Sequence, residues 1–142
     1  MTTKAKAYRR WAGNNREERL NYMAQWRRDN PVRACVHALV GGARSRSRKI
    51  GVDYDPLFLS VANIYAMIED DMTCPVCSVQ MTAVVEKGKL PTAISLDRVK
   101  NDKGYVEGNV RVICAKCNTR KRDMSADDLR QILAYIEANS RD

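Results

Sequence analysis

The sequence predicts an α+β fold, in which a mostly helical N-terminal arm precedes a zinc-stapled module and a C-terminal helix. Two Cys-x-x-Cys pairs, Cys74–Cys77 and Cys114–Cys117, are separated by 36 residues and have the spacing of a closed tetrahedral zinc site. Segments with strand character lie between the pairs, and amphipathic helical patterns lie outside them. We therefore predict a basic helical arm over residues 1–50 and a zinc-stapled domain over residues 51–142.

Zinc is expected because the chain is short and its cysteines have no oxidising context. A chain of 142 residues forms a small core that benefits from a staple. The first six residues lack the apolar stretch of a signal peptide, and no apolar run is long enough to span a membrane, so a cytoplasmic protein is expected. Thiols stay reduced in that compartment, which favours zinc binding by the two cysteine pairs over a redox pair or surface thiols. Cys35 lies outside the pairs and is predicted to be a small buried hydrophobic residue.

The net charge of +8 is distributed unevenly along the chain. Residues 1–50 hold 13 Lys and Arg against three acidic residues, whereas residues 51–142 hold 12 against 14. A basic arm on a nearly neutral domain suits binding to a phosphate backbone, because each neutralised phosphate releases counterions whatever the base sequence. A solvated helical arm without a nucleic-acid partner is the alternative.

The first part of the arm predicts two short helices. Spaced aromatic residues, including Trp11 and Trp26, lie in a polar segment that Gly13-Asn14-Asn15 interrupts. The second helix should run from about residue 16 to 29, with Leu20, Met23 and Trp26 on one side.

Asn30-Pro31 predicts the start of a third helix, with Asn30 as its N-cap and Pro31 at its first position. Its apolar stripe consists of Val32, Cys35, Val36, Leu39 and Val40. Gly41-Gly42 is expected to end the helix, and residues 43–49 are expected to form a flexible segment that grips phosphates. The cations of that segment are Arg44, Arg46, Arg48 and Lys49. A linker without a partner is the alternative.

Two further helices are predicted around the metal-binding module. Asp55-Pro56 repeats the cap-then-proline signal, and an apolar face formed by Leu57, Val61, Ile64, Tyr65 and Ile68 continues until residues 69–71 end the helix. Ser125 and Asp128 form a capping signature at the start of the C-terminal helix, whose stripe consists of Leu129, Ile132, Leu133 and Ile136.

A hairpin is predicted between the two cysteine pairs. Its strands cover residues 93–99 and 109–113, and the connection from Asn101 to Gly108 is longer than a tight turn. A helix should begin near Asn118, just after the second cysteine pair. The order is strand, loop, strand and helix, with zinc joining the second strand to the helix.

Three segments of this module form a recognisable set: Ser95-Leu96-Asp97-Arg98-Val99, Gly104-Tyr105-Val106-Glu107-Gly108-Asn109-Val110 and Cys114-Ala115-Lys116-Cys117-Asn118-Thr119-Arg120-Lys121. Together they resemble the HNH endonucleases of the ββα-metal (His-Me finger) class, and look most like the small bacteriophage members with zinc knuckles. The resemblance covers roughly residues 72–124, and several motifs in the right order are more specific than any one alone.

The resemblance implies roles for three polar residues. Asp97 matches the acidic ligand of a catalytic divalent ion, Mg²⁺ or Mn²⁺, and Asn118 matches the second ligand. Asn109 matches the asparagine that holds the loop and the catalytic residue in place. Taken singly, Asp97 could equally be a turn-capping aspartate and Asn118 an ordinary helix N-cap.

The sequence departs from the family at Arg98, which stands where the family has its general base, a histidine. Arginine stays protonated, so it cannot accept a proton from water, although it could clamp the scissile phosphate. Other candidates for activating the water are Tyr105, Asp102 and a metal-bound hydroxide. The chain's single histidine, His37, is a further candidate, and a packed or surface histidine is its ordinary reading.

The resemblance implies a metal-dependent DNA endonuclease, which would act in the cytoplasm of a host cell if a phage encodes it. Arg120 and Lys121 would extend the basic surface toward the DNA backbone, unless they are salt-bridged helix surface. The alternative is a catalytically inactive HNH-like zinc module that binds nucleic acid or a host protein as a regulator or inhibitor. No element for reading bases is evident, and nothing in the sequence predicts the oligomeric state.

Overall fold

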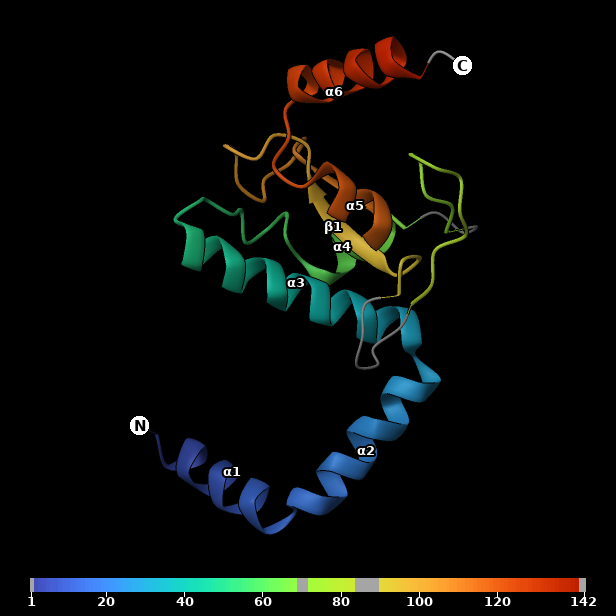
Figure 1. Ribbon diagram of the computed structural model, residues 1–142. Helices are drawn as coiled ribbons and strands as arrows, with labels where there is room; N and C mark the ends of the chain where they lie inside the picture. Colours follow the sequence, from blue (N-terminus) through green and yellow to red (C-terminus); the bar gives the residue numbers. More distant parts are fainter. Residues whose placement is uncertain (1, 69–71, 84–89, 141–142) are drawn as a thin grey trace.

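The computed structural model describes residues 2–68, 72–83 and 90–140. Figure 1 shows a central body with α1 and α2 projecting from one side and α6 lying on the opposite side. The elements in chain order are α1 (Thr3–Asn14), α2 (Arg16–Asp29), α3 (Pro31–Ile50), α4 (Val61–Ala66), β1 (Ile94–Arg98), β2 (Val110–Cys114), α5 (Ala115–Lys121) and α6 (Ala126–Asn139). Helices and a small two-stranded sheet in one chain confirm the predicted α+β class.

The junction between α2 and α3 forms at the predicted residues. Asn30 precedes α3 and Pro31 takes its first turn, as expected, but the Asn30 side chain serves the preceding helix. Its Nδ2 donates to the carbonyl of Trp26, 3.0 Å away, and so satisfies the C-terminal end of α2. Leu20 and Met23 of α2 are exposed, so the apolar side predicted for that helix is not buried within the described chain.

The prediction that Gly41-Gly42 ends the third helix is wrong, because α3 continues to Ile50. Val36, Val40, Ala43 and Ser47 are all buried and follow one another at helical spacing across the glycine pair. Burial of this stripe outweighs the weak helix preference of glycine, which is worth about 1 kcal/mol per residue. Gly51, at φ +70°, ends the helix instead, so the cations from Arg44 to Lys49 lie on a helix rather than a flexible segment.

The helix predicted after Asp55-Pro56 is shorter than expected. Asp55 Oδ1 accepts hydrogen bonds from the N–H groups of Leu57 and Phe58, which makes a turn, and Leu57 is 83% exposed. Ser60 is the N-cap of α4, since its hydroxyl accepts from the N–H of Asn63. The predicted end at residues 69–71 lies outside the described residues.

The hairpin forms as predicted. β1 and β2 pair antiparallel, with Asp97 opposite Arg111. One core unites the buried side of α3 with α4, the hairpin and the cysteine segment, through residues that include Val36, Val40, Leu59, Ile64, Leu96 and Val110. The interior side of α3 therefore shares its core with the strands.

The helix after the hairpin begins earlier than predicted. Cys114 ends β2 and is also the N-cap of α5, because its Sγ accepts from the N–H of Cys117 at 3.4 Å. Asn118 therefore lies inside α5 rather than at its start. This places its side chain one turn further along the helix than an N-cap would be.

The C-terminal helix begins with the predicted capping box. The hydroxyl of Ser125 accepts from the N–H of Asp128, and the Asp128 carboxylate accepts from the N–H and hydroxyl of Ser125. Those donors lower the pKa of Asp128. The predicted stripe of α6 lies on one side of the helix but stays about half exposed. No described helix has the length and apolar character needed to cross a membrane.

Candidate functional site

The four cysteines of the two Cys-x-x-Cys pairs meet at one point. The Sγ atoms of Cys74, Cys77, Cys114 and Cys117 all lie within 4.8 Å of one another. Cys77 Sγ and Cys114 Sγ are 3.7 Å apart. Thiolates bound to a tetrahedral zinc at about 2.3 Å would be about 3.8 Å apart, so this spacing fits a single metal ion.

Backbone contacts hold the cluster together across two distant segments. The N–H of Ser78 donates to the carbonyl of Cys74 at 2.8 Å and closes the turn after the first pair, where Ser78 adopts φ +57°. The N–H of Cys114 donates to Cys74 Sγ at 3.4 Å. The cluster thus links the turn that carries Cys74 and Cys77 to the end of β2 and the start of α5.

The thiol pKa values differ strongly within the cluster. Burial tends to raise the pKa of Cys74, but N–H groups of Cys114, Val76 and Cys77 that donate to its sulfur outweigh burial and lower the pKa to about 6. The pKa of Cys117 is raised to about 12 by burial, by hydrogen bonds with the sulfurs of Cys77 and Cys114, and by the charge on Cys114. Four adjacent thiolates repel one another, and a bound cation would relieve that repulsion.

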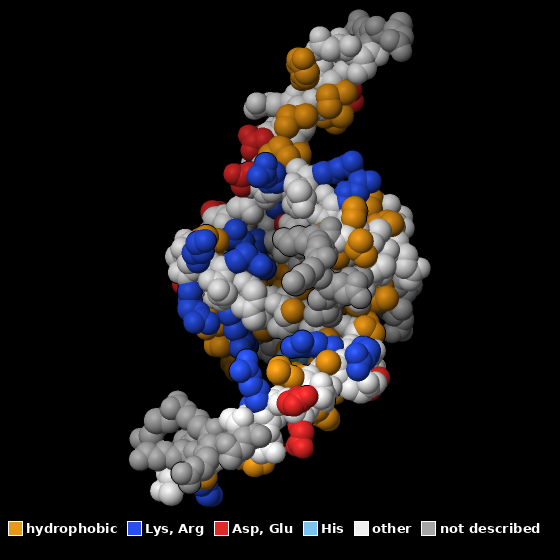
Figure 2. Space-filling model, turned by 60° about the horizontal axis from the view of Figure 1, so that its bottom comes forward, with side chains coloured by type: hydrophobic (Ala, Val, Ile, Leu, Met, Phe, Trp, Pro, Cys, Tyr) orange, Lys and Arg blue, Asp and Glu red, His pale blue; other side chains and the backbone are white. Residues whose placement is uncertain are grey.

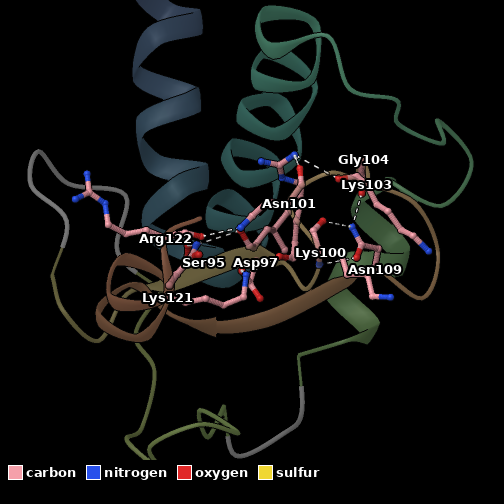
Figure 3. Close-up of polar contacts among 12 residues, drawn as sticks. Ser95, Asp97, Lys100, Asn101, Lys103, Gly104, Asn109, Lys121 and Arg122 are labelled. Carbon is pink, nitrogen blue, oxygen red and sulfur yellow. Dashed lines mark hydrogen bonds and ion pairs between the residues drawn. The ribbon is translucent and has the colours of Figure 1, made fainter. Parts of the chain in front are cut away.

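A second group of polar side chains lies between β1 and α5. Ser95 and Asp97 are two residues apart in β1, so their side chains leave the same face of the hairpin. Asn118 and Lys121 are three residues apart in α5 and share one helix face. Ser95 pairs with Asn118. Asp97 pairs with Lys121 (Figure 3), so two side-chain pairs join β1 to α5.

The orientation of the Asn118 amide follows from its contacts. Its Nδ2 is 2.7 Å from Ser95 Oγ and 3.2 Å from the carbonyl oxygen of Leu96. A carbonyl oxygen only accepts, so the amide nitrogen must face β1. The hydrogen bonds of Asn118 to β1 therefore use its Nδ2, and within the described residues Asn118 Oδ1 accepts none.

Asp97 is 6% exposed and forms an ion pair that the sequence analysis missed. Lys121 Nζ lies 3.0 Å from Asp97 Oδ1 and 2.8 Å from the carbonyl oxygen of Arg98. The sequence allows two interpretations of Lys121, a basic surface toward the DNA backbone and a salt-bridged helix surface, and neither identifies Asp97 as its partner. The signal that could have found the pair is the three-residue spacing from Asn118, which places both side chains over the same part of β1.

Arg98 leaves β1 on the opposite face from Asp97. Its Nη1 donates to the carbonyl of Asn101 at 2.9 Å and to that of Lys103 at 3.3 Å, and its Cζ lies 5.4 Å from the centre of the Tyr105 ring. Arg46 of α3 also contacts Tyr105, with Nε 3.1 Å from the phenol oxygen. Arg98 therefore holds the β1–β2 loop by hydrogen bonds and makes a cation–π contact with the buried Tyr105.

Asn109 holds the same loop from inside. Its Nδ2 donates to the carbonyl oxygens of Lys100 and Gly104, at 3.0 and 2.9 Å, and its Oδ1 accepts from the N–H of Lys100 at 2.9 Å (Figure 3). The side chain is 4% exposed and uses three of its four hydrogen-bonding positions. At the other end of the loop, Asn101 Nδ2 donates to the carbonyl of Arg122 beyond α5.

The sequence candidates for a proton acceptor lie in different surroundings. His37 is exposed on α3, and the centres of its ring and of the Trp26 ring are 5.8 Å apart in a T-shaped arrangement. Tyr105 is buried between the guanidinium groups of Arg46 and Arg98. Asp102 is exposed in the β1–β2 loop.

The four cations predicted to grip phosphate differ in their surroundings on α3. Arg44 donates to the carbonyl of Leu59 at 2.8 Å, and Arg46 binds Tyr105, so both contact the body of the fold. Arg48 and Lys49 are exposed in the last turn, where Arg48 Nε lies 3.4 Å from the Arg44 carbonyl oxygen. Figure 2 shows Lys and Arg side chains in several groups over the central body in this view.

Comparison with known proteins adds information on the fold. No protein-family model and no curated protein sequence matches this chain. Among solved structures, the chain is similar to the rare-cutting HNH restriction endonuclease PacI, with a TM-score of 0.50 and 17% sequence identity. The alignment covers 72% of this chain and 78% of that one. The chain therefore has an α+β fold similar to that of an HNH endonuclease, with a four-cysteine cluster able to hold a metal ion beside the hairpin.

Proposed function

We propose that this protein is a metal-dependent DNA endonuclease of the HNH type, related to the small bacteriophage members with zinc knuckles. The observation that carries the proposal is the corner between β1 and α5, where the buried Asp97 carboxylate and Asn118 come from adjacent elements. The fold similarity to an HNH restriction endonuclease supports it. The basic α3 supports DNA as the substrate, because it offers cations for the phosphate backbone.

In this proposal, Asp97 and Asn118 hold the divalent ion, Mg²⁺ or Mn²⁺. The residues fit such an ion, since a carboxylate and an amide oxygen are hard ligands and the hydrogen bonds of Asn118 to β1 use its Nδ2 rather than its Oδ1. When bound, the ion would polarise the scissile phosphate and stabilise charge on the leaving oxygen. Asn109 keeps the β1–β2 loop in the shape that presents Asp97, and the cysteine cluster holds structural zinc in the cytoplasm, where thiols stay reduced.

Arg98 would act through its charge, not as a base. Its guanidinium stays protonated, and only Nη1 is engaged with the loop carbonyls, which leaves other N–H donors for a phosphate oxygen. A charge-assisted hydrogen bond of this kind strengthens as negative charge develops on the phosphate. Water would have to be activated by another group.

The test is cleavage of supercoiled plasmid by zinc-loaded protein in Mg²⁺ and, separately, in Mn²⁺. Asp97→Asn is expected to lower the cleavage rate by about 10³-fold, because the substitution removes the anionic ligand, while DNA binding and zinc content remain. Asp123→Asn is the matched control, since it makes the same charge change at an exposed residue of the same module and should cleave like the wild type. Equal rates for Asp97→Asn and the wild type would refute the proposed site.

A second candidate function is a catalytically inactive module that binds nucleic acid or a host protein as a regulator. The contacts of Arg98 favour it, because a cation packed against the loop and Tyr105 stands where a base would be needed. A folded, DNA-binding protein that cuts nothing in Mg²⁺, Mn²⁺ or Ni²⁺ would support this alternative.

DNA binding should depend on the exposed cations at the end of α3. Neutralising Arg48 and Lys49 with glutamine is expected to weaken duplex binding. The slope of the logarithm of the binding constant against the logarithm of the salt concentration should become less steep by up to about 1.8, because two phosphate contacts are lost. The melting temperature should change little, since both side chains are exposed. Fluorescence anisotropy across a salt series, without added divalent ions, measures both quantities.

Arg44→Gln is the contrasting variant for this experiment. Arg44 donates to the Leu59 carbonyl, so its loss should lower the melting temperature by removing a hydrogen bond to the core segment. An unchanged salt dependence in the Arg48 and Lys49 variant would show that these two residues do not contact the DNA backbone.

A further inference from the structure

The ammonium group of Lys121 is bound to the oxygen atoms at the end of β1. Its Nζ is 3.0 Å from Asp97 Oδ1 and 2.8 Å from the carbonyl oxygen of Arg98. Figure 3 shows Lys121 beside Asp97, at the junction between α5 and the strand. One cation therefore bridges a carboxylate and a carbonyl from adjacent residues.

These acceptors are of the type that a divalent ion would use. Carboxylate and carbonyl oxygens are the protein ligands of hard cations, and such an ion binds at about 2.1 Å from its ligand. An ion at that distance from Asp97 Oδ1 would lie beside an ammonium that is 3.0 Å from the same oxygen. Like charges this close repel strongly where solvent screening is poor. Lys121 and a divalent ion therefore compete for Asp97 Oδ1.

The burial of the pair is asymmetric, which permits exchange. The Asp97 side chain is 8% exposed, whereas that of Lys121 is 22% exposed. Asp97 is fixed in a strand and cannot follow a departing partner. Lys121 is at the last position of α5 and carries its charge on a flexible four-carbon stem, so it can turn toward solvent.

We propose that Lys121 is a tethered counter-ion that occupies the divalent-ion position at Asp97 and sets the protein's affinity for that ion. This inference rests on the proposed function, because it takes Asp97 as the ligand of the divalent ion. In the metal-free protein Lys121 neutralises a buried carboxylate, and metal binding displaces it. The exchange weakens metal binding, since the ion must replace an existing ion pair.

Two opposite effects follow when the charge of Lys121 is removed. Lys121→Met leaves the Asp97 carboxylate buried without its cation, so the metal-free protein should melt at a lower temperature. The same substitution removes the competitor, so Mn²⁺ should bind more tightly and should restore the lost stability. A residue with only a structural role would lower stability without raising the affinity for Mn²⁺.

The experiment titrates zinc-loaded protein with Mn²⁺ and measures free Mn²⁺ by electron paramagnetic resonance, with no DNA present. Lys121→Met is expected to lower the dissociation constant by about 10-fold, within the usual range of coupling between two ligands. Lys121→Arg should bind Mn²⁺ as weakly as the wild type, because it keeps the charge. Lys121→Gln covers the case in which the methionine variant does not fold, since its amide can still donate to Asp97.

Two controls locate the binding and separate charge from position. Lys116→Met makes the same substitution on the same helix at an exposed residue and should leave the Mn²⁺ affinity unchanged. Asp97→Asn should abolish the Mn²⁺ binding that Lys121 affects.

Each outcome decides between this inference and the proposed function. Tighter binding in Lys121→Met or Lys121→Gln that requires Asp97 supports the tethered counter-ion. Binding that requires Asp97 but is equal or weaker in both variants overturns the role of Lys121 and leaves the proposed function standing. If no variant shows Asp97-dependent Mn²⁺ binding, both the divalent site and this inference are overturned.

Discussion

Replacing Cys114 with serine is expected to unfold the module around the hairpin. Cys114 is fully buried, ends β2, caps α5 and contributes one of the four clustered sulfurs. Structural zinc contributes about 10–16 kcal/mol of binding free energy in small zinc modules, as much as or more than the usual stability of a domain. Circular dichroism should show loss of the cooperative thermal transition, and metal analysis should show loss of the zinc ion proposed for the cluster. Chelation of that ion from the wild type should have the same effect.

Cys35→Ser is the matched control for the cysteine experiment. Cys35 is buried in α3, away from the cluster, and burial raises the pKa of its thiol. A buried hydroxyl in its place should cost about 1–3 kcal/mol of stability, while the protein keeps one zinc per chain. A cooperative melt at the wild-type temperature in Cys114→Ser, or in chelated protein, would show that no metal staples this fold.

Gly104→Ala is the second substitution with a large expected effect. A Cβ at Gly104 would lie 1.7 Å from the carbonyl oxygen of Asp53, a backbone atom that cannot turn aside. That carbonyl accepts from the N–H of Tyr105 at 2.9 Å, and the Gly104 carbonyl accepts from Asn109 at 2.9 Å. The added methyl group must therefore push apart the segment before α4 and the loop that Asn109 holds. We expect a loss of about 3 kcal/mol or more in the free energy of unfolding, measured by urea denaturation.

Gly41→Ala tests the same substitution where the structure leaves room. Gly41 lies inside α3, and a Cβ there would meet nothing within 4 Å. Alanine should stabilise the protein by up to about 1 kcal/mol, because it favours the helix and restricts the unfolded chain. Two glycine substitutions of opposite sign would support the close approach at Gly104, and a neutral Gly104→Ala would contradict it.

Local signals in the sequence identified most elements of the fold. The capping pair Ser125 and Asp128, the alternation in β2 and the spacing of the two cysteine pairs each depend on a few neighbouring residues. The structure places these elements where the local signals predicted them. The α+β class followed from the order of the elements.

Predictions failed where tertiary burial, or a competing local hydrogen bond, outweighed the local signal that was used. Gly41-Gly42 favours a helix end, yet α3 continues because Ala43 and Ser47 extend its buried stripe into the core. Asp55-Pro56 favours a helix start, but the Asp55 side chain closes a turn instead, and Ser60 caps the shorter helix. Periodicity alone does not reveal which of two competing local structures lets the chain fill the core.

The cysteine pairs and the order strand, loop, strand and helix follow from the sequence alone, since both depend on spacing along the chain. The contacts of each polar residue follow from the tertiary structure. In it Lys121 binds Asp97, and Arg98 packs against the loop and Tyr105, on opposite faces of one strand. These contacts depend on how α5 and α3 pack on the hairpin, because burial across the whole core, rather than neighbouring residues, sets that packing.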